Sequence, residues 1–403
     1  MNCVILLKNK LEQLDNILPL ILELRKHKLI TKPLFVSPTQ EHYHLVKLNI
    51  VIYECIQAMG GELIHMNRFK TPIINKVINL WILKKLMWRK SVIFELGYGF
   101  IKSSLILRYL CKFNRNVWRG KIVLSHFHSI PYGVIKKLSQ RRISYPEHQE
   151  PPERIVENYD RVLLSYSKSQ MMALSSNYYK ISIRNIPEIH VGYTRGYKEW
   201  DNFLIENQEK YLGAKLQGPF ILYIMPTLGQ PGRLDFADIK NPHHIESFKK
   251  SLKVLKDYNS RLLTVFRPHP TTDMKILDEI LHCINYRNYV ISYLHPLLLM
   301  KRANFVICPG ISSTLLTDSY YRAVPSIEFS NYHKDILKRT NGKGSYDKIT
   351  DYFVNDDEAK LREVIDKILA DGFKLDRDEE KMKELYPELS ADEIKAKFHF
   401  LKE

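Results

Sequence analysis

Two short apolar runs between residues 261 and 332 constrain the fold of this chain more than any other feature. Residues 262–266 read Leu-Leu-Thr-Val-Phe and are followed by Arg-Pro-His-Pro at 267–270. Residues 305–308, after Asn304, are also apolar and lead into a Pro-Gly-Ile-Ser-Ser-Thr turn at 309–314. Each run is typical of a buried parallel strand. The pattern therefore predicts an open α/β sheet with polar loops at its carboxyl edge, where such sheets bind ligands.

The polar residues of these two loops suit the phosphate of a nucleotide. The guanidinium of Arg267 can grip phosphate oxygens with its fork, and His269 can donate to phosphate or to cytosine. The second loop offers hydroxyls and backbone N–H groups at a helix start, and its candidate residues are Gly310, Ser312, Ser313 and Thr314. Structural uses exist too, because prolines end strands and serines cap helices. The spacing of one βαβα step favours phosphate binding and indicates a transferase with an activated donor.

Four residues of the first half are candidates for a catalytic base. His126 and His128 leave one predicted strand, and a histidine titrating near neutrality suits proton removal from an acceptor hydroxyl. Both could also be structural, since alternating residues share one side of a strand. Glu95 ends another strand, and Glu147 lies in a polar segment where a carboxylate could act as base or nucleophile. In the second half, Glu328 is either a solvated edge residue or an acceptor for ribose hydroxyls, and we favour the ribose.

The composition indicates a globular chain of two domains. Its 403 residues exceed one ordinary domain, and 45% apolar with 26% charged residues argue against wholesale disorder. Lys and Arg number 61 against 44 Asp and Glu, and the net charge of +17 suits polyanionic partners. The five cysteines show no CxxC spacing, which favours a reducing compartment and no structural zinc. No uncharged apolar stretch is long enough to span a bilayer.

Apolar runs alternate with amphipathic segments along both halves, which is the pattern of βαβ units. Strands are predicted at 4–7, 33–36, 62–64, 92–96, 121–125, 161–165, 189–192 and 220–224, and helices at 11–28, 51–59 and 102–112. A charged, loop-like span separates the halves. We predict an α/β fold of two facing Rossmann-like domains with a cleft between them. The expected parts are an acceptor-binding domain (1–196), a linker (197–217), a nucleotide-donor-binding domain (218–375) and a C-terminal helical segment (376–403).

The segment 74–90 is amphipathic and basic, with Trp81 and Trp88 among several lysines and arginines. It is similar to an interfacial helix on anionic lipid. An ordinary domain helix with a solvated lysine face explains the pattern equally well. Nucleic-acid binding is disfavoured, because the lysines of the chain are dispersed and no nucleic-acid-binding module is recognised.

Residues 189–332 resemble the donor domain of GT-B transferases that assemble bacterial surface polysaccharides. The motifs that carry the resemblance are Ile221-Leu222-Tyr223 with Pro226-Thr227, Arg267-Pro268-His269-Pro270, residues 303–314, and Val324-Pro325. One branch contains sialyltransferases and Kdo transferases, which use CMP-sugars. The other contains CDP-glycerol glycerophosphotransferases. The resemblance implies that His269 contacts the phosphate or cytosine of the nucleotide donor and that Ser312 and Ser313 contact the phosphate.

The chain also departs from the motifs of both branches. Residues 189–195 are similar to the Gly-Tyr-Pro-Arg element of the polyol branch, and residues 126–133 are loosely similar to its His-Gly base loop without the glycine. The acidic-acidic-glycine motif of the sialyltransferases is not found. Cys308-Pro309-Gly310 stands where the polyol branch has Thr-Asp-Tyr. These departures leave the base and the nucleotide of the donor open.

The leading expectation is a metal-independent GT-B glycosyltransferase, since no Asp-x-Asp follows a predicted strand. It would move a Kdo- or sialic-type sugar from a cytidine-nucleotide donor to a glycan or glycolipid acceptor of capsule or lipopolysaccharide. No cofactor, no metal and no nucleic acid are expected, and an anionic membrane surface is a further expected partner. The expected location is the cytoplasm, peripheral at the inner membrane. The alternatives are polyol-phosphate transfer from a CDP donor, or a non-catalytic subunit of a polysaccharide assembly complex.

Overall fold

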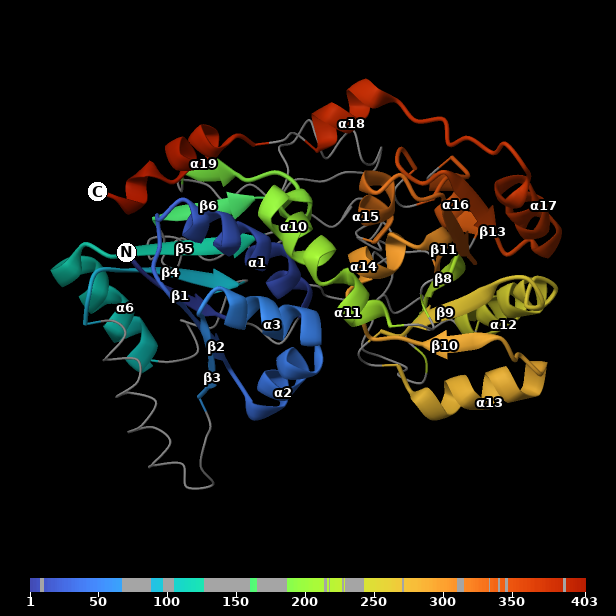
Figure 1. Cartoon of the computed structure of the whole chain (residues 1–403), viewed down its shortest axis with the longest axis horizontal. Helices are drawn as coiled ribbons and strands as arrows, with labels where there is room; N and C mark the ends of the chain where they lie inside the picture. The colour runs from blue at the N-terminus through green and yellow to red at the C-terminus, as the bar shows by residue number, and fades with distance from the viewer. Residues whose placement is uncertain are drawn as a thin grey trace.

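The chain forms two α/β halves, each built on a parallel sheet (Figure 1). This computed structural model describes residues 1–7, 11–66, 88–96, 105–126, 160–164, 187–213, 216, 218–226, 228, 243–269, 272–309, 315–332, 334–339, 341–344, 347–386 and 389–403. The first sheet contains β1 (Asn2–Leu6), β2 (Pro33–Ser37), β3 (Glu62–His65), β4 (Ser91–Leu96), β5 (Lys121–His126), β6 (Arg161–Leu164) and β7 (Glu188–His190). The second contains β8 (Phe220–Ile224), β9 (Leu263–Arg267), β10 (Tyr289–Ile291), β11 (Ala303–Pro309), β12 (Ser326–Ser330) and β13 (Tyr352–Asn355).

The two sheets share one strand order. It is β3-β2-β1-β4-β5-β6-β7 in the first half and β10-β9-β8-β11-β12-β13 in the second, with every pair parallel. Each order begins 3-2-1-4-5-6 when strands are counted within their own half, which is the Rossmann order. The chain therefore reverses direction across the sheet between β1 and β4, and again between β8 and β11. The prediction of two Rossmann-like sheets is confirmed.

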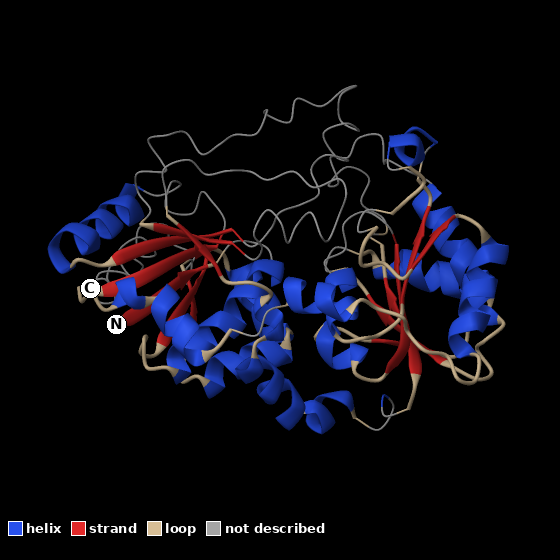
Figure 2. Cartoon of the chain, turned by 90° about the horizontal axis from the view of Figure 1, so that it is seen from above, coloured by secondary structure: helices blue, strands red, loops and turns tan. Residues whose placement is uncertain are grey.

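Helices cover the sheets and also lie between them (Figure 2). The first half has α1 (Leu11–Lys26), α2 (Gln40–Leu48), α3 (Ile50–Ala58) and α6 (Leu105–Trp118). The second has α12 (His243–Lys256), α13 (Met274–Ile284), α14 (Pro296–Met300), α15 (Leu315–Tyr321), α16 (Lys334–Arg339) and α17 (Glu358–Leu369). Local sequence sets their ends. The carboxylate of Asp273 accepts from the amide of Lys275 to cap α13, which ends at Asn285 in the left-handed conformation (φ 55°).

The span 197–217, expected to be loop-like, is largely helical. It contains α10 (Lys198–Glu206) and α11 (Gln208–Leu212). Trp200 and Leu204 lie four residues apart on α10 and are both fully buried, so they form one apolar stripe. Charged residues on both sides of Trp200, among them Glu199 and Asp201, hide this short periodicity in the sequence.

The last part of the chain returns to the first half (Figure 1). Arg377 fixes its start to the second half through both carboxylate oxygens of Asp351 (3.0 and 2.6 Å) and the carbonyl of Val324 (2.9 Å). The elements α18 (Glu379–Leu385), α19 (Ala391–Lys397) and the 3-10 turn η4 (His399–Leu401) follow. Phe400 is buried in the first-half core and lies under the guanidinium of Arg161, 5.1 Å from the ring centroid. One apolar core thus joins the two halves and this tail.

Candidate functional site

The carboxyl edges of the two sheets face each other. Asp15 lies on α1, just after β1, while His295 follows β10 in the second half. The Oδ1 atom of Asp15 is 3.8 Å from Nε2 of His295, which is completely buried. Burial lowers the pKa of Arg267, at the end of β9, and the nearby charge of Asp15 opposes that shift. Groups from both carboxyl edges therefore share one buried polar region.

Arg267 is held firmly at the end of β9. Its Nε donates to the carbonyl of Leu294 (3.0 Å), and Nη1 donates to the carbonyl of Pro268 (2.6 Å). The amide of Met225, just after β8, donates to the Arg267 carbonyl (3.0 Å). A guanidinium has five N–H donors, so Arg267 can hold its loop and still present N–H groups to an anion. It lies beside β8, next to the point where the strand order reverses.

His269 ends the described part of the same loop and is exposed. Its carbonyl accepts from the amide of Thr272 (2.9 Å), and the hydroxyl of Thr272 donates to the carbonyl of Pro226 (3.2 Å). The loops after β8 and β9 are therefore tied together. The exposure of the imidazole is compatible with the predicted contact to a nucleotide, and that contact stays a prediction.

Other predicted site residues lie outside the described residues: Gly310, Ser312, Ser313, Thr314, His128 and Glu147. The segment 74–87 of the predicted interfacial helix lies outside them as well. For His126 the structure describes the backbone at the end of β5, where it pairs with Leu164 of β6. The roles proposed for these residues remain predictions.

Two of the three candidate glutamates, Glu95 and Glu328, are completely buried within strands. Glu95 lies in β4 and pairs with Leu6 on one side and Leu124 on the other. The Oε1 atom of Glu328, in β12, accepts from the hydroxyl of Tyr332 (2.6 Å). A ribose hydroxyl could replace the tyrosine hydroxyl only if Tyr332 moved, so the predicted ribose contact requires a local rearrangement.

Sequence reasoning missed a buried ion pair that connects the halves. Nη2 of Arg195, from the 3-10 turn η1 (Thr194–Gly196), is 2.7 Å from Oδ2 of Asp318 on α15. The hydroxyl of Tyr193 donates to the other oxygen of Asp318. Burial, followed by the charge of Asp318, raises the pKa of Tyr193 well above its ordinary value. A signal existed in the sequence, because Asp318 is the single charged residue of the segment 315–321.

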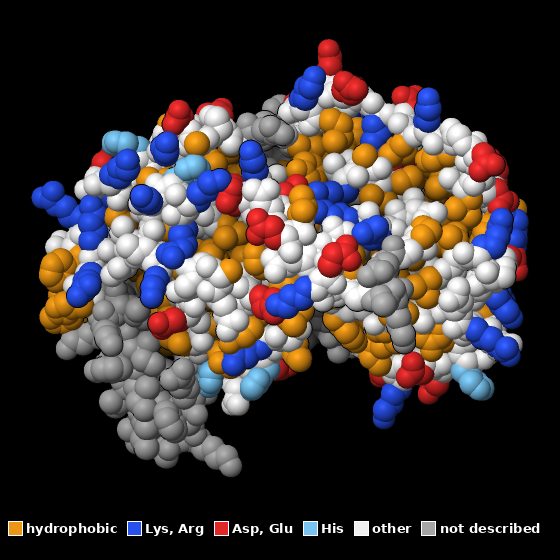
Figure 3. All heavy atoms as spheres, in the orientation of Figure 1, with side chains coloured by type: hydrophobic (Ala, Val, Ile, Leu, Met, Phe, Trp, Pro, Cys, Tyr) orange, Lys and Arg blue, Asp and Glu red, His pale blue; other side chains and the backbone are white. Residues whose placement is uncertain are grey.

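Charge is spread over the face shown in Figure 3, where Lys and Arg side chains alternate with Asp and Glu. Within the described part of the chain, no group of three or more His, Cys, Asp or Glu side chains could hold a metal ion. No helix among the described residues combines the length and apolar character that crossing a membrane requires.

Comparison with known proteins bears on the fold. No protein-family model and no curated protein matches the chain. Its structure is similar to S. aureus MnaA solved with UDP, at 12% identity and a TM-score of 0.52, covering 100% of this chain and 98% of MnaA. It is also similar to a putative UDP-N-acetylglucosamine 2-epimerase from Listeria monocytogenes, at 9% identity and a TM-score of 0.50, covering 100% and 97%. At these identities the similarity identifies the architecture, and the chain has the GT-B fold.

Proposed function

We propose that the chain is a nucleotide-sugar enzyme, and specifically a glycosyltransferase that uses the facing carboxyl edges as its site. One observation carries the proposal: Arg267 is fixed at the end of β9, beside the strand reversal of the second sheet and toward the first half. That position is where Rossmann-like sheets bind nucleotides. A guanidinium there would stabilise negative charge on the phosphate as it leaves the sugar.

The proposed division of labour follows the two halves. Arg267 and His269 would bind the nucleotide phosphate, with Ser312 and Ser313 completing the contact. The first half would bind the acceptor and supply the base that removes the proton from its hydroxyl. His126, His128, Glu147 and Glu95 remain the candidates for that base.

The nucleotide separates two versions of the proposal. The motif resemblance favours a CMP donor that carries a Kdo- or sialic-type sugar for a capsule or lipopolysaccharide glycan, with no metal required. The structural similarity to MnaA solved with UDP, and to a putative UDP-N-acetylglucosamine 2-epimerase, supports a second candidate, an enzyme that acts on a UDP-sugar and changes the sugar itself. Association with the inner membrane belongs to the first version, because its acceptor would be a glycolipid.

Incubation with CMP-Kdo, CMP-sialate, CDP-glycerol and UDP-N-acetylglucosamine tests both versions. Release of CMP that depends on a glycan acceptor supports the glycosyltransferase, and release with CDP-glycerol indicates polyol-phosphate transfer. An epimerised UDP-sugar without acceptor supports the second candidate. If no cytidine nucleotide binds or is released and UDP binds instead, the CMP donor is wrong. If none of these nucleotides binds, the result supports the alternative of a non-catalytic subunit.

A further inference from the structure

We propose that a cavity at the amino edge of the second sheet binds an anionic amphiphile, a molecule with a phosphate or carboxylate head and an apolar body. The cavity has a volume of about 630 Å³ and lies beside the first residues of β11 and the residues that precede β12. Arg267 lies at the opposite, carboxyl edge of the same sheet. The cavity is therefore separate from the proposed nucleotide site.

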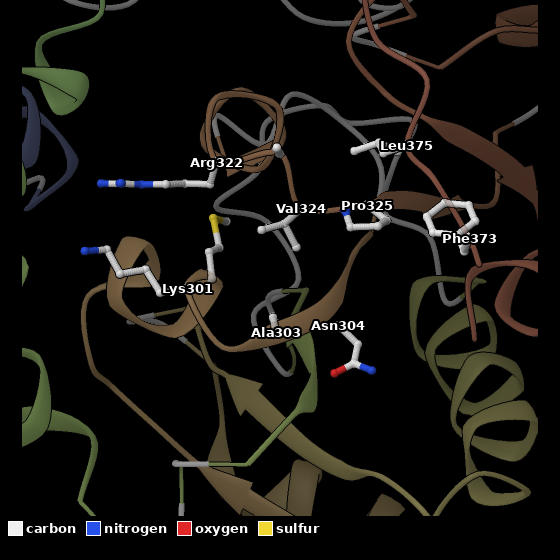
Figure 4. Close-up of a pocket in the computed structure, with 10 residues that line it drawn as sticks. Lys301, Ala303, Asn304, Arg322, Val324, Pro325, Phe373 and Leu375 are labelled. Carbon is white, nitrogen blue, oxygen red and sulfur yellow. The ribbon is translucent and has the colours of Figure 1, made fainter. Parts of the chain in front are cut away.

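Two cations lie together at one end of this cavity. Figure 4 shows the side chains of Lys301 and Arg322 extending side by side toward the first half. Burial and the charge of Arg322 lower the pKa of Lys301, while Asp201 opposes the shift. Two like charges that are partly removed from water destabilise each other. A negative group bound between them would relieve that repulsion.

The hydrogen-bonding capacity of these cations is incompletely used. Nη1 of Arg322 donates to Asp201 (3.1 Å), and Nη2 contacts the same carboxylate. Nε of Arg322 is buried and has no hydrogen-bond acceptor among the described residues. Within the same described part, the ammonium of Lys301 forms no hydrogen bond or ion pair. Two positive groups thus share one carboxylate, and buried donors without acceptors are costly. The arrangement suits one further anion.

The other end of the cavity carries mainly apolar side chains, with the amide of Asn304 beside them. Pro325, Phe373 and Leu375 lie there, away from the two charged groups, and the side chain of Val324 lies between (Figure 4). The volume is within the range of about 300–1,000 Å³ typical of small-molecule sites. A charged end and an apolar end in one cavity favour an elongated ligand whose head contacts Lys301 and Arg322.

Titration calorimetry with decyl phosphate and decanoate, below their micellar concentrations, tests this proposal. Two control ligands are decanol, which has only the apolar tail, and inorganic phosphate, which has only the anionic head. The variant Lys301→Gln removes the unpaired cation, and Lys253→Gln makes the same charge change at an exposed position of α12. Ala303→Leu narrows the cavity without changing its charge. Binding to vesicles with and without phosphatidic acid is also measured. This comparison shows whether the head group belongs to a membrane lipid or to a free amphiphile.

We expect both decyl anions to bind, and decanol and phosphate to bind at least tenfold more weakly. Lys301→Gln should weaken the anions about tenfold, as expected for loss of one charge-assisted hydrogen bond, and Ala303→Leu should weaken them too. Lys253→Gln should have no effect. Saturating CMP or UDP should not compete, so the result is independent of the proposed enzyme activity. Equal affinity of Lys301→Gln and the unmodified protein, equal affinity for decanol, or displacement by nucleotide would each overturn the proposal.

Discussion

Replacing Asp318 by asparagine should destabilise the protein far more than loss of a surface ion pair. The side chains of Arg195 and Asp318 are 3% and 0% exposed, so water cannot replace the lost carboxylate. Asparagine keeps the shape but leaves the guanidinium buried without its counter-charge. Removing one partner of a buried pair costs about 3–5 kcal/mol. Since folded proteins are stable by about 5–15 kcal/mol, this is a large fraction of the total.

Urea denaturation measures this difference, provided that the denaturant slopes of the variants agree. The matched control is Asp257→Asn, which breaks the ion pair between Asp257 and Arg362. The side chains of these two residues are 55% and 46% exposed, respectively. Such a pair contributes about 0.2–1 kcal/mol. The double variant Arg195→Met, Asp318→Leu should recover much of the loss, because it removes both charges. The reasoning is refuted if Asp318→Asn costs no more than Asp257→Asn.

The remaining predictions concern the site, the pH response, packing and the membrane. His269→Ala should leave unfolding unchanged, since the side chain is exposed, and should lower kcat/KM by about 2.7–4 kcal/mol of transition-state stabilisation; native turnover would remove His269 from the site. Burial lowers the pKa of His42 from 6.5 to about 4, so the unfolded chain protonates first and stability should fall as pH drops through this window. Urea midpoints of His42→Gln should show a flatter pH slope there, and an unchanged slope would exclude His42 as the cause. Gly344→Ala should cost about 1–3 kcal/mol because the new Cβ overlaps the buried glutamate carboxylate of β12, whereas Gly218→Ala meets nothing and serves as the control in the same thermal melts. If the segment 74–90 is interfacial, the protein should pellet with anionic vesicles at low salt and be released at high salt; equal recovery with neutral vesicles would argue for an ordinary helix.

The fold was largely predictable from sequence because parallel strands buried on both faces leave strong local signals. The run 220–224 is completely apolar and its strand is buried at every position. The helices of the span 197–217 were not predicted because their apolar stripe is short and charged residues flank it. The order of strands in a sheet depends on contacts between residues far apart in the sequence. The sequence indicated this order only indirectly, because alternating strands and helices favour right-handed βαβ connections between parallel strands.

The site was less predictable, because its described polar contacts connect residues far apart in the chain. Arg267 could be predicted because the residues of its motif are adjacent in the sequence. Asp318 was not singled out, since a carboxylate on a helix is usually a solvated residue, and its partners Tyr193 and Arg195 lie more than a hundred positions earlier. Burial of Glu95 and Glu328 could not be read from the alternation of a strand, because both faces of these sheets are covered.

The return of the C-terminal segment to the first half has a mechanical consequence. The polypeptide passes between the halves twice, once through α10 and α11 and once between Arg377 and α19. Two domains that are connected by a single linker can rotate relative to each other about any axis. A second linker restricts them to rotation about the line through both crossings. Rotation about other axes would strain the backbone or remove Phe400 from the core in which it is buried. Any relative movement of the facing edges is therefore limited by both crossings, and it would also have to disrupt the shared apolar core and the buried pair of Arg195 and Asp318.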